Sequence, residues 1–216
     1  MSSVVIVSRD PQRALHWRRD LAGASHDVVA ITNSARSARA LLSQHQPRLV
    51  ISDLRLIDGT ALAMIHWLAS EPDGQRPLII VVAPDPHDAL LREAMCAGAD
   101  NYHLDRPDGD SLAACVHHTL LGESALSPPL ARALLDHFDR MAPRAADGRA
   151  VDATSSALQL EADERELLLQ VATGSELPDL AEQRSLHPHH LGLLARAAMR
   201  KLQWDRRAGS LTLQAA

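Results

Sequence analysis

One carboxylate stands where a side chain can do chemistry: Asp53 ends the apolar run LVIS at 49–52 and precedes the turn-forming stretch LRLIDG. A carboxylate at the end of a buried strand lies at the edge of a sheet, where it can act as a nucleophile or accept hydrogen bonds. Other apolar runs also end in polar or small residues, and parallel strands would bring these ends together. They are Ser8, Arg9 and Asp10 after the first run, Ala83 after the fourth and Asp105 after the fifth.

The elements that must position these residues follow from two alternating periodicities in the first 120 or so residues. Short β-branched runs lie at 4–7, 27–31, 48–52, 77–82 and 101–104, and amphipathic stretches of helix length lie at 11–22, 35–45, 60–70, 87–97 and 109–121. Five strands alternating with five helices predict an α/β fold with a doubly wound, five-stranded parallel sheet. Its functional crevice lies beyond the carboxyl ends of the strands, where Asp53 is expected.

A different organisation begins after Gly122. A helix is predicted at 128–141, and the small, polar stretch at 142–157 has the composition of a flexible linker. Three helical segments follow at 162–173, 177–185 and 188–202, which is the layout of a helix-turn-helix unit. The sequence therefore predicts one domain at 1–122, a connecting helix and linker at 123–157, and a small all-α domain at 158–216.

Composition excludes several classes of protein. The chain is 46% hydrophobic and 23% charged, which is an ordinary globular balance, and its net charge of −5 argues against nonspecific binding to polyanions. The N-terminus reaches Arg9 too early for a signal peptide, and no run of about 18 apolar residues exists, so a cytoplasmic protein without membrane contact is expected. Cys96 and Cys115 share no metal-binding spacing and are expected to be buried, reduced thiols. No nucleophile–base pair or phosphate-binding loop indicates an enzyme.

Three stretches carry a resemblance to a known family: SDLRLIDG around Asp53, AGADNYHL at 97–104 and LEADERELLLQVATG at 160–174. The N-terminal half resembles the receiver domain of bacterial response regulators, whose sheet has the flavodoxin-like order. The C-terminal half resembles the LuxR-type helix-turn-helix, and the pair is typical of the NarL/FixJ group of transcription factors. The resemblance implies a DNA-binding transcriptional regulator that acts as a homodimer.

Receivers of this family transfer a phosphoryl group to an aspartate. An acidic pair on strand 1 holds a divalent cation, a strand-5 lysine pairs with the phosphate, and a strand-4 hydroxyl follows it. By this resemblance Asp53 occupies the acceptor position and Tyr102 the switch aromatic position. The other positions depart from the pattern: the acidic pair reads Ser8-Arg9 with Asp10 one residue further along, Ala83 replaces the hydroxyl residue, and Asp105 replaces the lysine.

These departures predict weak or absent magnesium binding, and we expect no cofactor or metal site. Arg9 would place a positive charge where the cation should bind, and Asp105 would repel a phosphoryl group on Asp53. We expect Arg9 and Arg55 to pair with Asp53 or Asp105 instead, so that the domain holds one conformation without phosphorylation. The alternative is that Asp53 is only a surface carboxylate. Regulation is then expected through the face that includes Tyr102, by protein contact or a small ligand.

The third helix of the C-terminal domain is expected to read DNA, but its family pattern is incomplete. His187 takes the place of the usual threonine, and Leu191-Gly192-Leu193-Leu194 takes the place of a Val-Lys-x-His run. From Leu158 to Ala216 seven Lys or Arg face eight Asp or Glu, so the electrostatic contribution to DNA binding is small. The expected DNA contacts are His187, His189, His190, Arg196, Arg200, Lys201, Arg206 and Arg207.

Two functions stay open at this point. The first is a phosphorylation-independent transcription regulator that binds paired half-sites as a dimer, and the second is a protein-interaction module that modulates a kinase or another regulator. In the second case the partner would bind the receiver face or the third helix. Burial of Leu191 and Leu194 would leave only a sparse polar face for DNA, whereas their exposure would create an apolar patch that suits a protein partner. Trp17, Trp67 and Trp204 are expected in the cores.

Overall fold

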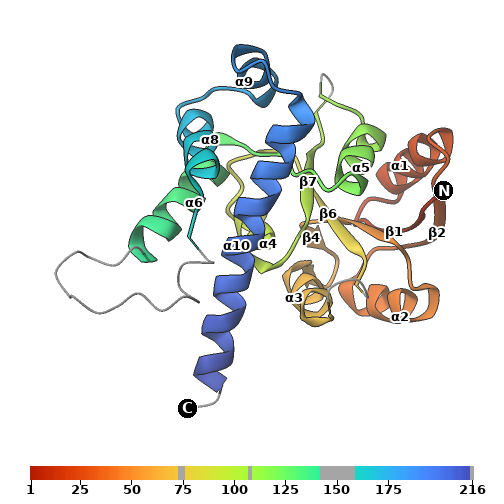
Figure 1. Ribbon diagram of the computed structural model, residues 1–216. Coiled ribbons are helices and arrows are strands. Elements are labelled where there is room, and N and C mark those ends of the chain that lie inside the picture. Colours follow the sequence, from red (N-terminus) through yellow and green to blue (C-terminus); the bar gives the residue numbers. More distant parts are fainter. Residues whose placement is uncertain (73–75, 107–108, 142–158, 215–216) are drawn as a thin grey trace. The chain divides into compact units, whose positions relative to one another are not determined.

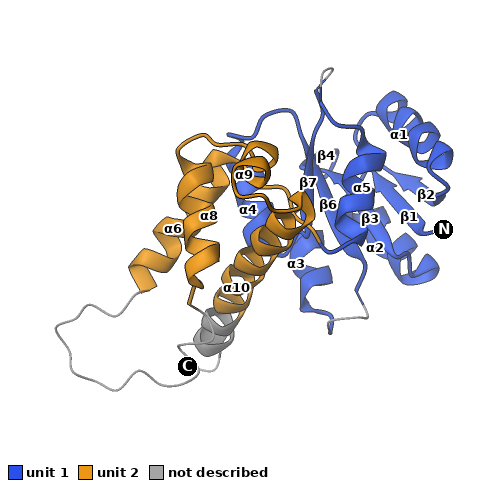
Figure 2. Cartoon of the chain, turned by 45° about the horizontal axis from the view of Figure 1, so that its top comes forward, with its two compact units in different colours: residues 1–122 blue, residues 123–216 orange. Residues whose placement is uncertain are grey.

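A computed structural model of the chain describes residues 1–72, 76–106, 109–141 and 159–214, with side chains up to Arg207. The chain forms two compact units, Met1–Gly122 and Glu123–Ala216 (Figure 2). The flexible linker expected at 142–157 lies outside the described residues. No helix among those residues is long and apolar enough to span a membrane.

The first unit is built on a five-stranded parallel sheet in the order β2-β1-β3-β6-β7, which confirms the predicted fold class (Figure 1). Its strands are β1 (Ser3–Val7), β2 (Asp27–Thr32), β3 (Leu49–Asp53), β6 (Leu78–Ala83) and β7 (Asn101–Leu104). The strand order reverses between β1 and β3, whose register pairs Val7 with Ser52. This register brings Ser8 beside Asp53 at the switch point of the sheet, where ligands of such folds bind.

Helices cover both faces of this sheet. Figure 1 shows α1 (Pro11–Gly23) and α5 (Leu112–Leu120) on one face, and α2 (Ala35–His45) and α3 (Leu62–Ser70) on the other. The helix α4 (Ala89–Ala97) contacts α3 and β6. Alternate strand residues, among them Ile6, Ile51 and Ile80, form one core cluster with Trp17 of α1 and Val116 of α5. Since strand side chains alternate between faces, Asp53 continues the series of Leu49 and Ile51 toward α1.

A short hairpin that the sequence did not reveal follows β3. Its strands are β4 (Arg55–Leu56) and β5 (Gly59–Thr60), and Gly59 adopts a φ of 135° that favours glycine. The helix expected from residue 60 therefore begins at Leu62.

The opposite edge of the sheet carries a buried ion pair. Asp100 is fully buried and accepts two hydrogen bonds of 2.8 Å from the guanidinium of Arg76, which is itself almost fully buried. The backbone N–H of Ile79 also donates to Asp100, at 2.7 Å. This carboxylate joins the start of β6 to the turn before β7.

The second unit consists of α6 (Pro128–Met141), α8 (Ala162–Ala172), α9 (Leu177–Gln183) and α10 (Pro188–Gln214). The helix expected only to connect the domains, α6, belongs to this unit because it packs against α8 and α10. It buries an apolar face that includes Leu130, Leu134 and Phe138. The third helix of the predicted helix-turn-helix is much longer than the stretch 188–202, since α10 runs for 27 residues.

Polar contacts fix the direction of α6. The guanidinium of Arg132 donates to the carbonyl of Ala172 at 2.8 Å, and Asp139 pairs with Arg165 at 2.7 Å. Residues late in α6 therefore meet residues early in α8, so these two helices are antiparallel.

Two expectations about aromatic and sulfur side chains can be compared with the structure. Both cysteines are buried and neither forms a disulfide, and burial raises the pKa of the Cys115 thiol to about 12. Trp17 is buried and Trp67 is half-buried, but Trp204 is 57% exposed, so its expected place in a core was wrong.

The buried ion pair generates a prediction for stability. Asp100→Asn leaves the buried guanidinium of Arg76 without its countercharge, so we expect the free energy of unfolding to fall by about 3 kcal/mol. Urea unfolding followed by tryptophan fluorescence measures this change. The exposed substitution Asp27→Asn is the control, and equal stabilities for the two variants would contradict the prediction.

Candidate functional site

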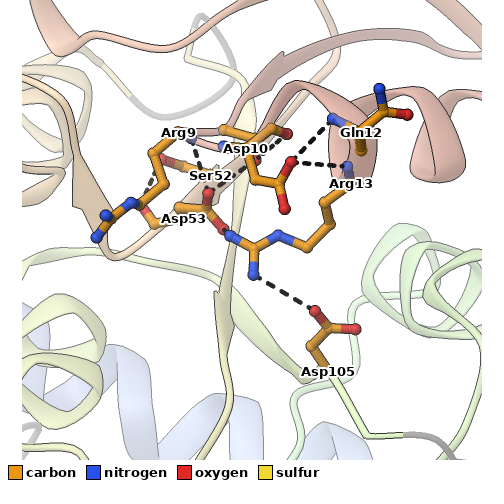
Figure 3. A network of polar contacts seen from close by, with 8 residues as sticks. Arg9, Asp10, Gln12, Arg13, Ser52, Asp53 and Asp105 are labelled. Atoms are coloured by element: carbon orange, nitrogen blue, oxygen red, sulfur yellow. Dashed lines mark hydrogen bonds and ion pairs between the residues drawn. The ribbon is translucent and has the colours of Figure 1, made fainter.

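Asp53 is held at the switch point by donors from the end of β1. Its carboxylate is only 4% exposed. One oxygen, Oδ2, accepts hydrogen bonds from the hydroxyl of Ser8 at 2.8 Å and from the backbone N–H of Arg9 at 2.9 Å (Figure 3). Asp53 is therefore part of an internal network and is not a surface carboxylate.

The second oxygen of Asp53 pairs with Arg13, a residue of α1 that the sequence analysis did not single out. Nη2 of Arg13 lies 2.6 Å from Oδ1 of Asp53, and Nη1 lies 3.6 Å from Oδ2 of Asp105, so one guanidinium bridges the ends of β3 and β7 (Figure 3). Arg13 lies one helical turn before Trp17 and is stacked over its ring at 5.3 Å. This spacing was the available signal, because it places Arg13 on the face of α1 that turns to the core.

Asp10 has a local role at the start of α1. Its Oδ1 accepts from the backbone N–H groups of Gln12 and Arg13, at 2.9 and 3.4 Å, and so caps the helix. The cap fixes the first turn of α1, from which the side chain of Arg13 reaches Asp53. The carboxylate that could have contributed to a cation site is thus used to orient the helix.

Carboxylates also fix the loops around the site. Asp88 caps α4 by accepting from the N–H of Leu90 at 2.9 Å, and it pairs with both terminal nitrogens of Arg55. The hydrogen bond from Arg55 lowers the pKa of Asp88 below its ordinary value. Asp58, from the β4–β5 hairpin, accepts from the N–H groups of Ala35 and Arg36 at 2.9 and 3.0 Å, and these bonds lower its pKa as well. The hairpin is therefore tied to the first turns of two helices.

The site includes a cavity of about 300 Å³. Three arginines and three aspartates contribute to its lining, together with an apolar wall; the lining residues are Arg9, Asp10, Arg13, Asp53, Leu54, Arg55, Val82, Ala83, Pro84 and Asp105. No group of three or more His, Cys, Asp or Glu side chains in the described part of the chain is placed to hold a metal ion. A divalent cation does not fit these residues, because the guanidinium of Arg13 lies against Asp53 and Asp10 caps a helix.

The structure changes the partners expected for the arginines. Arg9 gives only its backbone N–H to Asp53, and Arg55 pairs with Asp88, so the expectation that these two side chains would pair with Asp53 or Asp105 was wrong. Arg13 makes both pairs instead. Ala83 and Asp105 line the cavity as the sequence suggested, and Tyr102 is buried in β7, with 5% of its surface exposed.

Two basic residues expected to contact DNA are partly or fully buried in the second unit. Lys201 pairs at 2.7 Å with Glu164, which is 3% exposed, and Arg196 is 7% exposed. The same Glu164 accepts from the backbone N–H of Glu161 in the capping box of α8. Arg196 is therefore buried and Lys201 is half-buried in an ion pair, so little of either side chain is available to the expected phosphate-contacting stripe, which itself stays a prediction.

What is exposed on α10 is a mixed face. His190, Arg200 and Arg206 are exposed, as is His187 just before the helix, whereas Arg207 is half-buried and His189 pairs with Glu123. Leu191 is fully buried and Leu194 is half-buried, so a sparse polar face is left, whereas Leu193 and Trp204 are 38% and 57% exposed.

Curated proteins of known function are similar to this chain over most of its length. No protein-family model matches it. The transcriptional regulatory protein UhpA of Escherichia coli is 27% identical over 175 residues, which cover 81% of this chain and 78% of UhpA. The DNA-binding transcriptional activator DevR/DosR of Mycobacterium tuberculosis is 31% identical over 118 residues, 54% of either chain. The chain is a homologue of response regulators of the NarL/FixJ group.

A solved structure shows the same fold. The response regulator RcsB from Salmonella enterica serovar Typhimurium, bound to promoter DNA, superposes with a TM-score of 0.53 and 16% identity over 94% of this chain and 92% of RcsB. The likeness shows a receiver-like sheet followed by a helical unit. At 16% identity, the likeness shows the fold and not the chemistry of the site.

The bridge made by Arg13 generates a second prediction. Arg13→Ala leaves the buried Oδ1 of Asp53 without its charged partner, so we expect a loss of about 2 kcal/mol in the free energy of unfolding. The control is Arg18→Ala, an exposed arginine on the same helix. Urea unfolding of both variants checks this, and a loss no larger for Arg13→Ala than for Arg18→Ala would show that the bridge is not a stabilising contact.

Proposed function

We propose that the protein is a DNA-binding transcriptional regulator of response-regulator type that works without phosphorylation of Asp53. The observation that carries the proposal is the guanidinium of Arg13 between Asp53 and Asp105. It supplies a fixed positive charge where a phosphorylated receiver would need a cation and a lysine. The lining of the cavity then has three arginines for its three aspartates before any phosphodonor arrives.

Phosphoryl transfer to Asp53 would be unfavourable for two physical reasons. The attacking oxygen would have to leave either the 2.6 Å contact with Arg13 or the hydrogen bonds from Ser8 and Arg9. The added phosphoryl charge would then lie near Asp105 without a metal to neutralise it, and like charges repel strongly in a partly buried site.

A phosphodonor experiment tests this. We expect acetyl phosphate with magnesium to add no phosphoryl mass to Asp53 in the intact protein, as measured by mass spectrometry. The comparison variant is Arg13→Ala/Ser8→Asp/Asp105→Lys, which removes the bridge and introduces an acidic residue and a lysine at the positions that departed from the receiver pattern. Stoichiometric phosphorylation of the unsubstituted protein would sink the proposal.

The proposal that the second unit binds DNA rests on the relatives and on the residues left exposed on α10. DevR/DosR is a DNA-binding transcriptional activator, and RcsB has been solved as dimers on DNA. In this chain His190, Arg200 and Arg206 of α10, and His187 just before it, are exposed residues that suit phosphate contacts. We therefore infer that a homodimer binds DNA with modest affinity and a small salt dependence.

Two neighbouring cations on α10 make a matched test. Arg200→Ala should weaken DNA binding at every sequence and reduce the slope of log affinity against log salt by about 1, because it removes one phosphate contact. Lys201→Ala should leave that slope unchanged and lower stability instead, because Lys201 pairs with Glu164. Fluorescence anisotropy with genomic DNA fragments at several salt concentrations measures the slopes. The opposite assignment of the two effects would contradict the placement of the DNA contacts.

A protein-interaction module is the second candidate function, and one observation favours it. Leu193 and Trp204 are exposed on α10, while Arg196 is buried and Lys201 is half-buried in its ion pair with Glu164. Tryptophan and arginine are enriched in the central residues of protein interfaces. Saturable, fragment-selective binding to DNA supports the regulator, whereas no DNA binding at low salt would favour this module.

A further inference from the structure

The segment Glu123–Ser127, which precedes α6, lies across the first turns of α10. The backbone N–H of Ser124 donates to the carbonyl of Gly192 at 3.1 Å, and the carboxylate of Glu123 pairs with Nδ1 of His189 at 2.5 Å. Glu123, Ser124 and Ser127 are all less than a tenth exposed. Two contacts one helical turn apart on α10 thus join this segment to the start of the helix.

Gly192 is what allows this close approach. A Cβ at this position would lie 2.9 Å from both Cβ and Cγ of Glu123 and 3.0 Å from its carboxylate oxygen. Real Cβ atoms essentially never approach other atoms to 2.9 Å, so a side chain at 192 would require Glu123 to shift. A glycine inside a helix costs about 1 kcal/mol relative to alanine. The close approach of Glu123 gives a reason for a glycine at position 192.

The helix α6 continues this contact along α10. Ser124 meets Gly192, and thirteen residues later His137 meets Asp205 at 2.9 Å, so both contacts have a sequence separation of 68. This constant separation means that α6 runs parallel to α10. The segment Glu123–Ser127 and the helix α6 that follows it therefore both lie along α10.

We propose that Glu123–Ser127 is an internal occupant of the DNA-facing start of α10, and that DNA binding requires it to lift off. The inference rests on the proposed function. Gly192 lies in the stretch that matches the DNA-reading run of the LuxR-type helix, and His189 lies beside it at the start of that helix. The carboxylate of Glu123 gives His189 the negative partner that a phosphate would give. DNA and the segment therefore compete for one site, and the apparent affinity for DNA falls with the fraction of molecules in which the segment is closed.

Two substitutions release the segment by different means. Gly192→Ala adds the colliding Cβ while it favours the helix, and Glu123→Ala removes the carboxylate. Their controls are Gly23→Ala, where an added Cβ meets nothing within 4 Å, and Asp136→Ala, which removes an exposed negative charge from the same unit. All variants are tested in the full-length protein.

One measurement reports the opening of the segment, and a second reports the affinity for DNA. Hydrogen exchange at the Ser124 amide reports whether the bond to Gly192 is closed, and anisotropy with labelled genomic duplex fragments reports affinity. We expect exchange about tenfold faster and DNA dissociation constants about three- to tenfold lower in both releasing variants, with the controls close to the unsubstituted protein.

The outcomes divide cleanly. Unchanged exchange at Ser124 in both releasing variants overturns the inference. If the unsubstituted protein binds DNA, faster exchange in these variants with an unchanged affinity for DNA overturns it as well. An affinity gain in Asp136→Ala as large as in Glu123→Ala would assign the effect to charge alone and also overturns it. Absence of DNA binding in every variant overturns the proposed function, together with the competition, while exchange at Ser124 still reports whether the segment is closed.

Discussion

The guanidinium of Arg13 is the contact on which the functional edge of the first unit depends. It joins the ends of β3 and β7 through Asp53 and Asp105, and it originates from a helix whose first turn is fixed by Asp10. Around it, Arg55 pairs with Asp88, and Asp58 caps α2 across the hairpin. Each of these carboxylates therefore has a hydrogen-bond or ion-pair partner within the fold.

The second unit follows the same physical pattern. Glu164 is buried and has Lys201 as its partner, Asp205 has His137, and Glu123 has His189. Each pair joins two segments of the unit, so charged side chains that a DNA-binding surface would display instead hold helices together. Burial of one partner makes such a contact costly to break, since an unpaired buried charge is strongly unfavourable. This explains how a homologue of DNA-binding regulators can have so sparse a basic surface.

Under the proposed function, the states of the protein differ in which internal contacts are closed, and not in whether a phosphate is present. A ligand or partner can shift such an equilibrium only as far as it binds one state better than the other. In the second unit the contact that can open is defined by single residues: a carboxylate at 123, a histidine at 189 and a glycine at 192. In the first unit the corresponding contact is the bridge from Arg13 to Asp53 and Asp105.

The sequence by itself determined the fold class, because strand and helix periodicities and the strand ends at Asp53 and Asp105 are local features. It also located the cavity, since parallel strands bring their carboxyl ends together. Only the tertiary structure decided which arginine pairs with Asp53, because Arg13, Arg9 and Arg55 are similar in sequence terms and differ in the direction that packing gives their side chains. The roles of Lys201 and Gly192 could not be predicted for a similar reason. Lys201 pairs with Glu164, 37 residues away, and Gly192 contacts Glu123, about 70 residues away. Only the packing of the second unit brings these residues together.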